Sequence, residues 1–293
     1  MEPREVAARS LMVAAMFDAV AETYDTVAVP WFGPIAEGLV ERMDPRPGER
    51  AIDLGTGRGA ALWPLASAVA PDGEVTGLDL SVQMIATARA ELVRQSAARA
   101  LAPIDLVVGD ATAPELPERS YDVAVASLVL FFLPEPAAAL RSWYRLLVPG
   151  GRLGISTFAS RDAAWDRLDD VFTPYLPPAL LDARTSGARG PFASDGGVAG
   201  LLEESGFVDV ATQVMALPVH FADVEQWRAW TWSHGQRSHW LPVPVEARDG
   251  VLAEAARRLV PITEPDGGFT LTQQVRYTTG RRPSLPSADV TPA

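Results

Sequence analysis

The chain has 293 residues, a length that suits one large domain or one domain with a substantial insertion. Its 25 lysines and arginines are outnumbered by 37 aspartates and glutamates, which gives a formal net charge of −12. An acidic surface of this size repels phosphate backbones and anionic membranes, which argues against nucleic acid and membranes as partners.

The sequence contains no cysteine, which excludes disulfides and zinc–thiolate sites, and we expect no metal in the functional site. The apolar stretch 11–17 is too short for a signal peptide and has acidic residues on both sides. The longest apolar run, residues 123–133, is well below the roughly 20 residues that span a membrane. These features predict a soluble, cytoplasmic protein. Whether it is a monomer or a homodimer stays open.

The N-terminal residues are predicted to be helical. Apolar residues recur at helical spacing over 6–20 and again over 35–43. Either an ordinary packing helix or a segment covering a ligand would show this pattern. The aromatic residues of this part of the chain are Phe17, Tyr24, Trp31 and Phe32.

The segment 51–60, Ala-Ile-Asp-Leu-Gly-Thr-Gly-Arg-Gly-Ala, predicts a buried strand, a tight turn and the start of a helix. Its three glycines accept positive φ and, lacking a Cβ, let the backbone approach a ligand closely. Asp53 precedes the first glycine, where a turn that binds pyrophosphate gains nothing from a negative charge. A cationic ligand without phosphate would tolerate this carboxylate.

Two further strands are predicted, 73–79, which ends in an acid, and 104–108, which is followed by one. Asp79 follows the glycines by a little over about 20 residues, where open α/β sheets place an acid against ribose hydroxyls. Its alternative role is to cap the next helix, although Ser81 serves that purpose as well. Asp110 follows the second of these strands and could equally be a turn-forming residue.

The later elements continue the alternation of strands and helices. The apolar run 123–128 predicts a strand buried on both faces, and 137–147 predicts a helix. Pro149 and two following glycines permit a chain reversal into the next strand. A further helix is predicted over 194–205, and the last two strands over 207–219 and 270–278.

Several motifs in order over about residues 15–158 resemble class I S-adenosylmethionine-dependent methyltransferases of the small-molecule branch, which includes quinone-biosynthesis and natural-product enzymes. They are the glycine segment, Gly109-Asp110-Ala111, Leu116-Pro117, Ser120-Tyr121-Asp122 and Leu147-Val-Pro-Gly-Gly-Arg-Leu153. The segment 17–25 resembles the part of the quinone-biosynthesis enzymes that folds over the cofactor. The resemblance implies an α/β, Rossmann-like, seven-stranded, mostly parallel sheet sandwiched by helices, with a helical lid formed by the N-terminus and by insertions around the sixth strand.

The resemblance also implies S-adenosyl-L-methionine as cofactor, with Asp79 on the ribose and Asp110 on the adenine amino group. Met84 is expected either to touch the adenine or to fill core, and backbone groups of Ser127 and Leu128 to line the cofactor. The expected cofactor-binding residues are Tyr24, Asp53, Gly55, Thr56, Gly57, Asp79, Leu80, Met84, Gly109, Asp110, Ala111, Ser127 and Leu128.

The insertion at 221–262 is rich in tryptophan and, with His220 just before it, contains all three histidines. Trp227 and Trp230 have helical spacing and are expected in the core rather than around a ligand. His234 and His239 are the candidate catalytic bases, and each could instead be structural. The expected substrate pocket comprises Trp31, Phe132, Trp165 and Trp232.

The expected segments are 1–47, an N-terminal helical lid; 48–158, the cofactor-binding core; 159–192, an irregular and helical insertion with a mobile part at 184–191; 193–220, a continuation of the core; 221–262, the aromatic substrate lid; 263–282, the last core strand; and 283–293, a disordered tail.

The function expected is in-line methyl transfer to O, N or C of a lipophilic small molecule, such as a polyketide, terpenoid, phenolic or alkaloid intermediate. Residues 127–133 lack the Asp/Asn-Pro-Pro-aromatic motif of the enzymes that methylate amines of DNA bases or glutamine. Three alternatives stay open: the cofactor is held while the lid catalyses a cyclisation or rearrangement, the protein is a non-catalytic binding module, or it is a nicotinamide oxidoreductase, against which Asp53 and Asp110 argue.

Overall fold

The computed structural model describes residues 3–177 and 190–284. Its elements, in chain order, are α1 (Pro3–Val20), α2 (Phe32–Met43), β1 (Arg50–Leu54), α3 (Leu62–Ala68), β2 (Glu74–Asp79), α4 (Val82–Ala98), β3 (Ile104–Val108), β4 (Tyr121–Ser127), η1 (Leu130–Phe132), α5 (Pro136–Leu146), β5 (Leu147–Arg161), α6 (Ala163–Asp169), η2 (Asp170–Phe172), η4 (Gly190–Ala193), α8 (Asp195–Glu204), β6 (Val208–Phe221), α9 (Val224–Ser233), α10 (Arg237–Trp240), η5 (Val245–Ala247), α11 (Arg248–Leu259), η6 (Val260–Ile262) and β7 (Phe269–Arg281). The mobility expected at 184–189 and the tail expected at 285–293 lie outside the described residues.

Seven strands form one sheet in the order β3-β2-β1-β4-β5-β7-β6. The first five are parallel, and β7 runs antiparallel to both β5 and β6. The predicted Rossmann-like, mostly parallel sheet is therefore confirmed. Since the carboxyl ends of parallel strands meet at one edge, the loops after β1, β2, β3 and β4 are brought together there.

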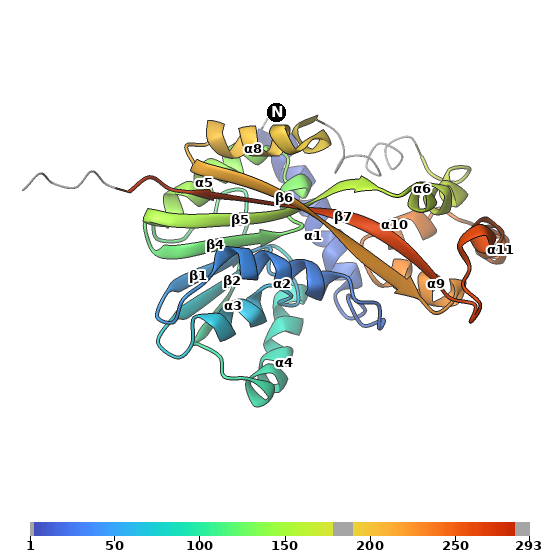
Figure 1. The fold of residues 1–293 in the computed structure, drawn as a ribbon, viewed down its shortest axis with the longest axis horizontal. Helices are drawn as coiled ribbons and strands as arrows, with labels where there is room; N and C mark the ends of the chain where they lie inside the picture. Colours follow the sequence, from blue (N-terminus) through green and yellow to red (C-terminus); the bar gives the residue numbers. More distant parts are fainter. Residues whose placement is uncertain (1–2, 178–189, 285–293) are drawn as a thin grey trace, which may run out of the picture.

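Helices cover both faces of the sheet (Figure 1). The side chain of Tyr277 on β7 faces α2, where the Arg42 guanidinium lies 4.2 Å from the centre of its ring. A Cβ on Gly280, three residues later, would lie 3.3 Å from Leu202 of α8. Residues three apart in a strand point to opposite faces, so α2 and α8 lie on opposite sides of the sheet. One continuous core fills the space between the layers.

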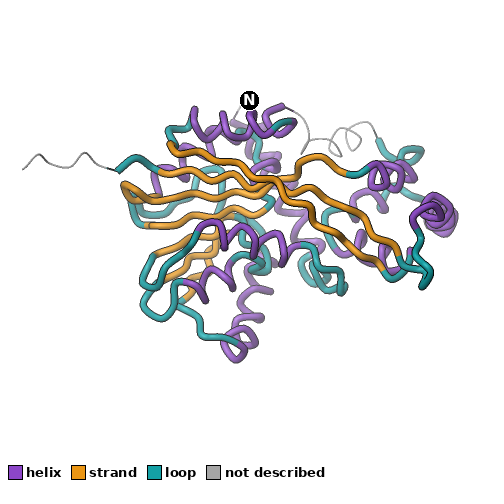
Figure 2. The backbone as a smooth tube through the Cα atoms, in the orientation of Figure 1, coloured by secondary structure: helices purple, strands orange, loops and turns teal. Residues whose placement is uncertain are grey.

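Past the last pair between β5 and β7, Arg161 with Gln273, the strands β6 and β7 continue together as a two-stranded ribbon (Figure 2). The helices α6, α9, α10 and α11 gather around the far end of this ribbon (Figure 1). There Phe221 pairs with Phe269, and their buried rings stack with centres 5.2 Å apart. The tryptophan-rich insertion 221–262 therefore begins at the end of this ribbon.

The end of the N-terminal helix α1 packs outside the main core. Val20 and Ala21 pack with Met84 of α4 in a small cluster separate from the main core. The Asp18 carboxylate accepts hydrogen bonds from the Ser81 hydroxyl and from the backbone N–H of Gln83, 3.1 Å away. Within the described residues, no helix combines the length and apolar character needed to cross a bilayer.

Candidate functional site

The loop between β1 and α3 is the glycine turn predicted from the sequence. Gly55 and Gly57 have φ values of 75° and 53°, in the left-handed region that favours glycine. The backbone N–H groups of Gly55 and Thr56 donate to the Leu78 carbonyl at 2.8 and 2.9 Å, which ties the loop to β2. A Cβ on Gly57 would meet nothing within 4 Å, because this glycine borders open space.

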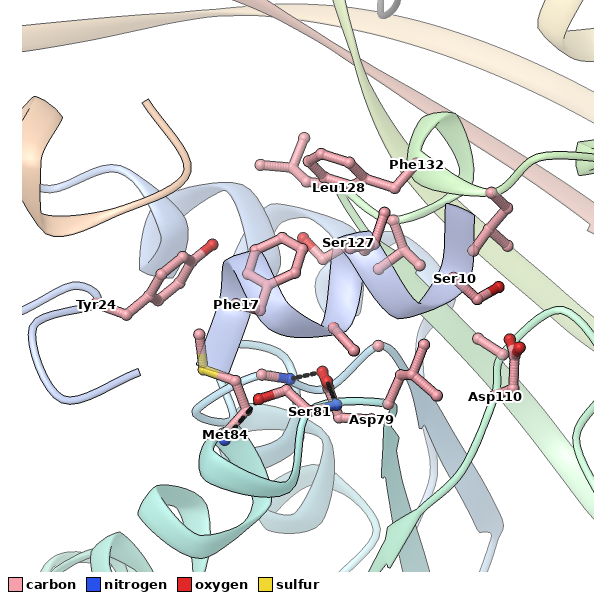
Figure 3. Close-up of a pocket in the computed structure, with 18 of the residues that line it drawn as sticks. Ser10, Phe17, Tyr24, Asp79, Ser81, Met84, Asp110, Ser127, Leu128 and Phe132 are labelled. Carbon is pink, nitrogen blue, oxygen red and sulfur yellow. Dashed lines mark hydrogen bonds between the residues drawn. The ribbon is translucent and has the colours of Figure 1, made fainter. Parts of the chain in front are cut away.

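That open space is a cleft at the carboxyl ends of β1 to β4, roofed by α1 (Figure 3). Tyr24 and Asp110 lie toward opposite ends of it (Figure 3). We call it the glycine-loop cleft, and it is lined by Ser10, Val13, Ala14, Phe17, Tyr24, Gly55, Gly57, Asp79, Leu80, Ser81, Met84, Asp110, Ala111, Ser127, Leu128, Val129, Phe132, Leu133 and Pro134.

Asp79 stands at the end of β2 and organises the floor of this cleft (Figure 3). One carboxylate oxygen accepts the backbone N–H of Gly57 at 2.7 Å, and the other accepts that of Ser81 at 2.8 Å. Burial raises the pKa of this carboxyl, and the two backbone donors act in the opposite direction. The helix-capping role is taken by Ser81, whose hydroxyl accepts the N–H of Met84 at 3.0 Å.

The remaining acid of the cleft, Asp110, also has a local role. Its carboxylate accepts the backbone N–H of Thr112 at 2.8 Å, which is the turn-forming arrangement considered from the sequence. Asp110 nevertheless lines the cleft, so its role in the turn is compatible with a contact to a ligand there. Met84 likewise lines the cleft while its side chain is 1% exposed and packs with Val20.

A polar recess lies on the other side of the glycine loop. It shares Tyr24, Gly55, Gly57 and Ser127 with the cleft, and its other lining residues are Asp25, Thr26, Phe32, Gly33, Glu37, Asp53, Thr56, Arg58, Ala60, Ala61, Trp63, Pro64, Glu91, Arg94, Gln95 and Arg99. Its charged groups include the ion pair between Arg58 and Glu91, at 2.7 Å.

Asp53 is the buried acid of this recess, with 1% of its surface exposed. It accepts the Thr56 hydroxyl at 2.7 Å and the backbone N–H of Leu62 at the start of α3. Burial nevertheless raises the pKa of Asp53 to about 7. Burial also raises the pKa of the Tyr24 hydroxyl far above its usual range, with smaller contributions from Asp25 and Asp79.

Ten of the thirteen expected cofactor-binding residues line the glycine-loop cleft. Asp53 and Thr56 line the adjoining recess instead. Gly109 lines neither space: its N–H donates to the Asp79 carbonyl at 2.9 Å, and a Cβ would come within 2.7 Å of Leu78. The geometry thus gives Gly109 a packing role rather than a place against a ligand.

The end of β4 forms the wall between the cleft and a second cavity. Leu128 has a φ of 58°, which is uncommon for a residue with a branched side chain. Its N–H donates to the carbonyl and the hydroxyl of Ser156, both at 3.1 Å, which holds this conformation. Strained backbone of this kind is concentrated at functional sites.

The second space, the aromatic cavity, lies between α1, the end of β4 and the helices on the β6–β7 ribbon. It holds about 1780 Å³ of open space including its mouth, and is lined by Arg9, Met12, Val13, Met16, Phe17, Tyr24, Trp31, Phe32, Leu128, Phe131, Phe132, Phe158, Ala159, Trp165, Asp169, Trp230, His234, Gly235, Gln236, Ser238, His239 and Gln273. Three of the four expected pocket residues, Trp31, Phe132 and Trp165, and both candidate histidines are thus brought together.

Trp232 differs from the expectation because it does not line the aromatic cavity. The guanidinium groups of Arg237 and Arg248 lie 5.6 and 5.1 Å from the centre of its ring. Trp227 is fully buried in the core, as expected, whereas Trp230 is buried and also lines the cavity. The helical spacing of these tryptophans did not indicate which face of α9 would meet the cavity.

His234 follows the last residue of α9 and has a defined environment. Burial lowers its pKa to about 3, and the nearby His239 adds to the decrease. Its ring contacts those of Trp230 and Phe32, with centres 4.4 and 5.8 Å apart. The backbone N–H of Gln236 donates to its Nδ1 at 3.3 Å.

The sequence analysis expected an N-terminal lid but did not name the residues of α1 that line the cleft. Ser10, Val13, Ala14 and Phe17 all line it, and their i, i+3, i+4, i+7 spacing is one face of a helix. That spacing was visible in the sequence, but it did not show that this face of the helix would line the cleft. Gln273 of β7 and Asp169 of α6 gave no recognisable signal before the fold placed them in the aromatic cavity.

Comparison with known proteins gives consistent matches. A family model described as a methyltransferase domain matches residues 52–155. The chain is 34% identical over 277 residues to nocamycin O-methyltransferase of Saccharothrix syringae. This alignment covers 91% of the present chain and 97% of the relative. It is 38% identical over 170 residues to aklanonic acid methyltransferase DauC of Streptomyces sp. (strain C5). This second alignment covers 58% of the present chain and 76% of the relative.

A solved structure of the [4+2]-cyclase SpnF has a similar fold, with a TM-score of 0.55 over 94% of this chain and 97% of the other. The two sequences are 19% identical, so this likeness shows a common fold alone.

Proposed function

The chain belongs to the S-adenosylmethionine-dependent methyltransferases, and from this premise we propose that it methylates a lipophilic small molecule, an intermediate of a secondary metabolite. The main support for the proposal is that the glycine-loop cleft and the aromatic cavity share a wall. Five residues line both the glycine-loop cleft and the aromatic cavity: Val13, Phe17, Tyr24, Leu128 and Phe132. A cofactor in the first space and an acceptor in the second would meet across this wall.

The residues of the cleft fit the cofactor. Gly57 borders the cleft with no atom near its absent Cβ, which leaves room for a ligand against the backbone. The Asp79 oxygens, each already accepting one backbone N–H, keep free lone pairs for the ribose hydroxyls. Asp110, which lines the same cleft, would accept a hydrogen bond from the adenine amino group, and the polar recess around Asp53 would take the amino-acid end.

The aromatic cavity supports an apolar acceptor. Its walls are mainly aromatic and aliphatic, and the edge-to-face contact of Phe17 with Phe132, 5.4 Å between ring centres, closes the common wall. Polyketide, terpenoid, phenolic and alkaloid intermediates all fit this chemistry. The two relatives named above are, by their names, methyltransferases of nocamycin and of aklanonic acid, which supports a small-molecule acceptor.

S-adenosylmethionine supplies a methyl group that is already activated for displacement. The chain therefore needs mainly to hold the acceptor in line and to exclude water. The helix α1 roofs both spaces, so its closure would separate them from solvent. A general base is required only where the acceptor atom has to lose a proton.

The test is incubation of the purified protein with S-adenosylmethionine carrying a deuterated methyl group and with candidate acceptors, beginning with aklanonic acid. Mass spectrometry should show an acceptor that gains the labelled methyl group while S-adenosylhomocysteine accumulates. Conversion of an acceptor without consumption of S-adenosylmethionine would favour cyclisation or rearrangement instead. Tight cofactor binding without conversion of any acceptor would favour a binding module.

A further inference from the structure

The side chain of Gln273 on β7 points toward the aromatic cavity. Val275, two residues later, pairs with Phe158 of β5, and partners across an antiparallel pair project from the same face of the sheet. Side chains two residues apart in a strand also share a face, and β7 pairs with β6 without a shift between Gln273 and Val275. Gln273 therefore projects on the same side as Phe158, and both residues line the cavity.

A hydrogen bond of the Gln273 amide fixes which end of it is the acceptor. Nε2 donates to the backbone carbonyl of Gln274 at 2.8 Å, and a carbonyl can only accept, so the nitrogen must occupy this position. No group of residues 3–177 and 190–284 donates a hydrogen bond to Oε1, the other end of the amide. Oε1 is not one of the fully buried unpaired atoms in that part of the chain, so it keeps a surface that a ligand can reach.

This oxygen stands on an otherwise apolar stretch of strand. The neighbours of Gln273 on the same face are Leu271 and Val275, and all three residues are at most 2% exposed. Since β7 lies between β5 and β6, the small exposed surface of Gln273 belongs to the cavity that it lines. An apolar molecule that fills the cavity displaces water from Oε1, and an amide oxygen left without a donor is costly. The ligand must therefore bring a donor of its own.

A hydroxyl group is the donor that suits this position. Oε1 can only accept, so a ketone or ether oxygen of the ligand cannot pair with it, whereas an O–H group can. An ammonium group would bring a charge into a cavity with mainly aromatic and aliphatic walls, at a large cost in desolvation. A phenol or an alcohol supplies the donor while the molecule stays neutral.

We propose that Gln273 selects methyl acceptors that carry a free hydroxyl group, which donates a hydrogen bond to Gln273 Oε1. The inference rests on the methyl-transfer function proposed above. Gln273 lines the aromatic cavity but not the wall that this cavity shares with the glycine-loop cleft. The hydroxyl that it binds is therefore a second group of the acceptor, which orients the molecule, and not the atom that receives the methyl group.

Two naphthalene derivatives test for this hydrogen bond. 1-Naphthol and 1-methoxynaphthalene share the ring system and the oxygen, and only the naphthol has a donor. Binding of each to the protein in excess S-adenosylhomocysteine is measured by ligand-observed NMR. The wild type should prefer the naphthol, and this preference should fall about five- to tenfold in Gln273→Leu, the loss expected for one hydrogen bond.

A second variant and a control separate the oxygen from the strand. Gln273→Met keeps the unbranched side chain but replaces the amide with a thioether, a weak acceptor. It should lose the preference to a similar extent, and it carries the test if the leucine variant does not fold. Gln274→Leu is the matched control, because Gln274 lines none of the three spaces and its backbone carbonyl can still accept Gln273 Nε2. This change should leave the preference as in the wild type.

The proposal is overturned if the wild type binds both molecules equally or binds neither, or if the preference survives in both Gln273 variants. A preference lost equally in Gln274→Leu also overturns it, since the effect would then come from the strand. No methyl transfer is measured here, so the two proposals fail separately. Labelled product with an unchanged preference removes only the role of Gln273, whereas a preference lost in the variants without labelled product removes only the proposed function.

Discussion

The carboxylate of Asp79 accepts the backbone N–H of Gly57 at 2.7 Å, and this bond joins the end of β2 to the glycine loop that follows β1. The two residues are 22 positions apart in the chain. The bond fixes the loop against the acid, so the glycine that leaves room for a ligand and the carboxylate that could bind it form one unit.

Replacement of Asp79 by alanine should weaken S-adenosylmethionine binding by about 1–3 kcal/mol, the scale of lost hydrogen bonds to a charged group. Isothermal titration calorimetry measures the change. Asp105→Ala on β3 removes the same charge from an exposed position outside the three spaces, and should leave the affinity unaltered. Equal affinity of Asp79→Ala and the wild type would remove Asp79 from the cofactor site.

Replacement of Gly57 by valine should abolish cofactor binding while thermal unfolding stays cooperative. The new side chain enters open space in the cleft, where the ligand would lie, rather than a packed core. Gly48→Val is the control, because Gly48 also has a positive φ, 88°, and open space around it, but lines none of the three spaces. Both variants should be destabilised by backbone strain, and only Gly57→Val should lose binding. Normal binding by Gly57→Val would show that the loop is wrongly placed.

The buried carboxyl of Asp53 should make the stability of the cofactor-free protein depend on pH. Its pKa rises from 3.8, the ordinary value expected in the unfolded chain, to about 7 in the folded protein. The folded state therefore binds the proton more tightly, and this stabilising contribution is complete below about pH 4 and lost as the pH rises through about 7.

Asp53→Asn has no proton to lose at this position. The free energy of unfolding of the wild type, measured by urea denaturation and compared with that of Asp53→Asn, should fall from about pH 4 to about pH 7. A difference between the two proteins that stays constant over this range would contradict the raised pKa.

The lid helix α1 should loosen when Arg237 is replaced by methionine. Its guanidinium donates to the Ala19 carbonyl at 2.8 Å and to the Thr23 hydroxyl at 2.6 Å, and so joins the end of α1 to the aromatic lid. Loss of these two bonds should raise hydrogen exchange over residues 3–20 by roughly thirtyfold and speed cofactor release, since each bond contributes about 1 kcal/mol.

Arg248→Met is the matched control, because Arg248 also lies over the Trp232 ring while its hydrogen bond goes to Val243 and not to α1. Hydrogen-exchange mass spectrometry compares the two variants. If exchange over 3–20 rises equally in both, the effect comes from the contact with Trp232, and Arg237 has no special role in holding the lid.

Much of the glycine-loop cleft could be predicted because its residues directly follow strands that the sequence pattern predicts. Gly55, Gly57, Asp79 and Asp110 each stand just after an apolar run, and parallel strands bring such positions to one edge of the sheet. The apolar runs predicted the strands, and the shared edge of parallel strands then predicted that these residues lie together. The exception, Gly109, has the same position along the chain, but its missing Cβ serves packing against Leu78.

The aromatic cavity could not be predicted in full, because it is formed by contacts between segments that are far apart in the sequence. Ala19 and Arg237 meet although 218 residues separate them, and the β6–β7 ribbon decides which face of α9 turns inward. For that reason Trp230 lines the cavity while Trp232 packs under two arginines. The sequence by itself determined the sheet, the glycine loop and its acids, because these follow from short-range periodicity and turn chemistry. Only the tertiary structure decided which side chains line the aromatic cavity, because their direction is set by packing between distant segments.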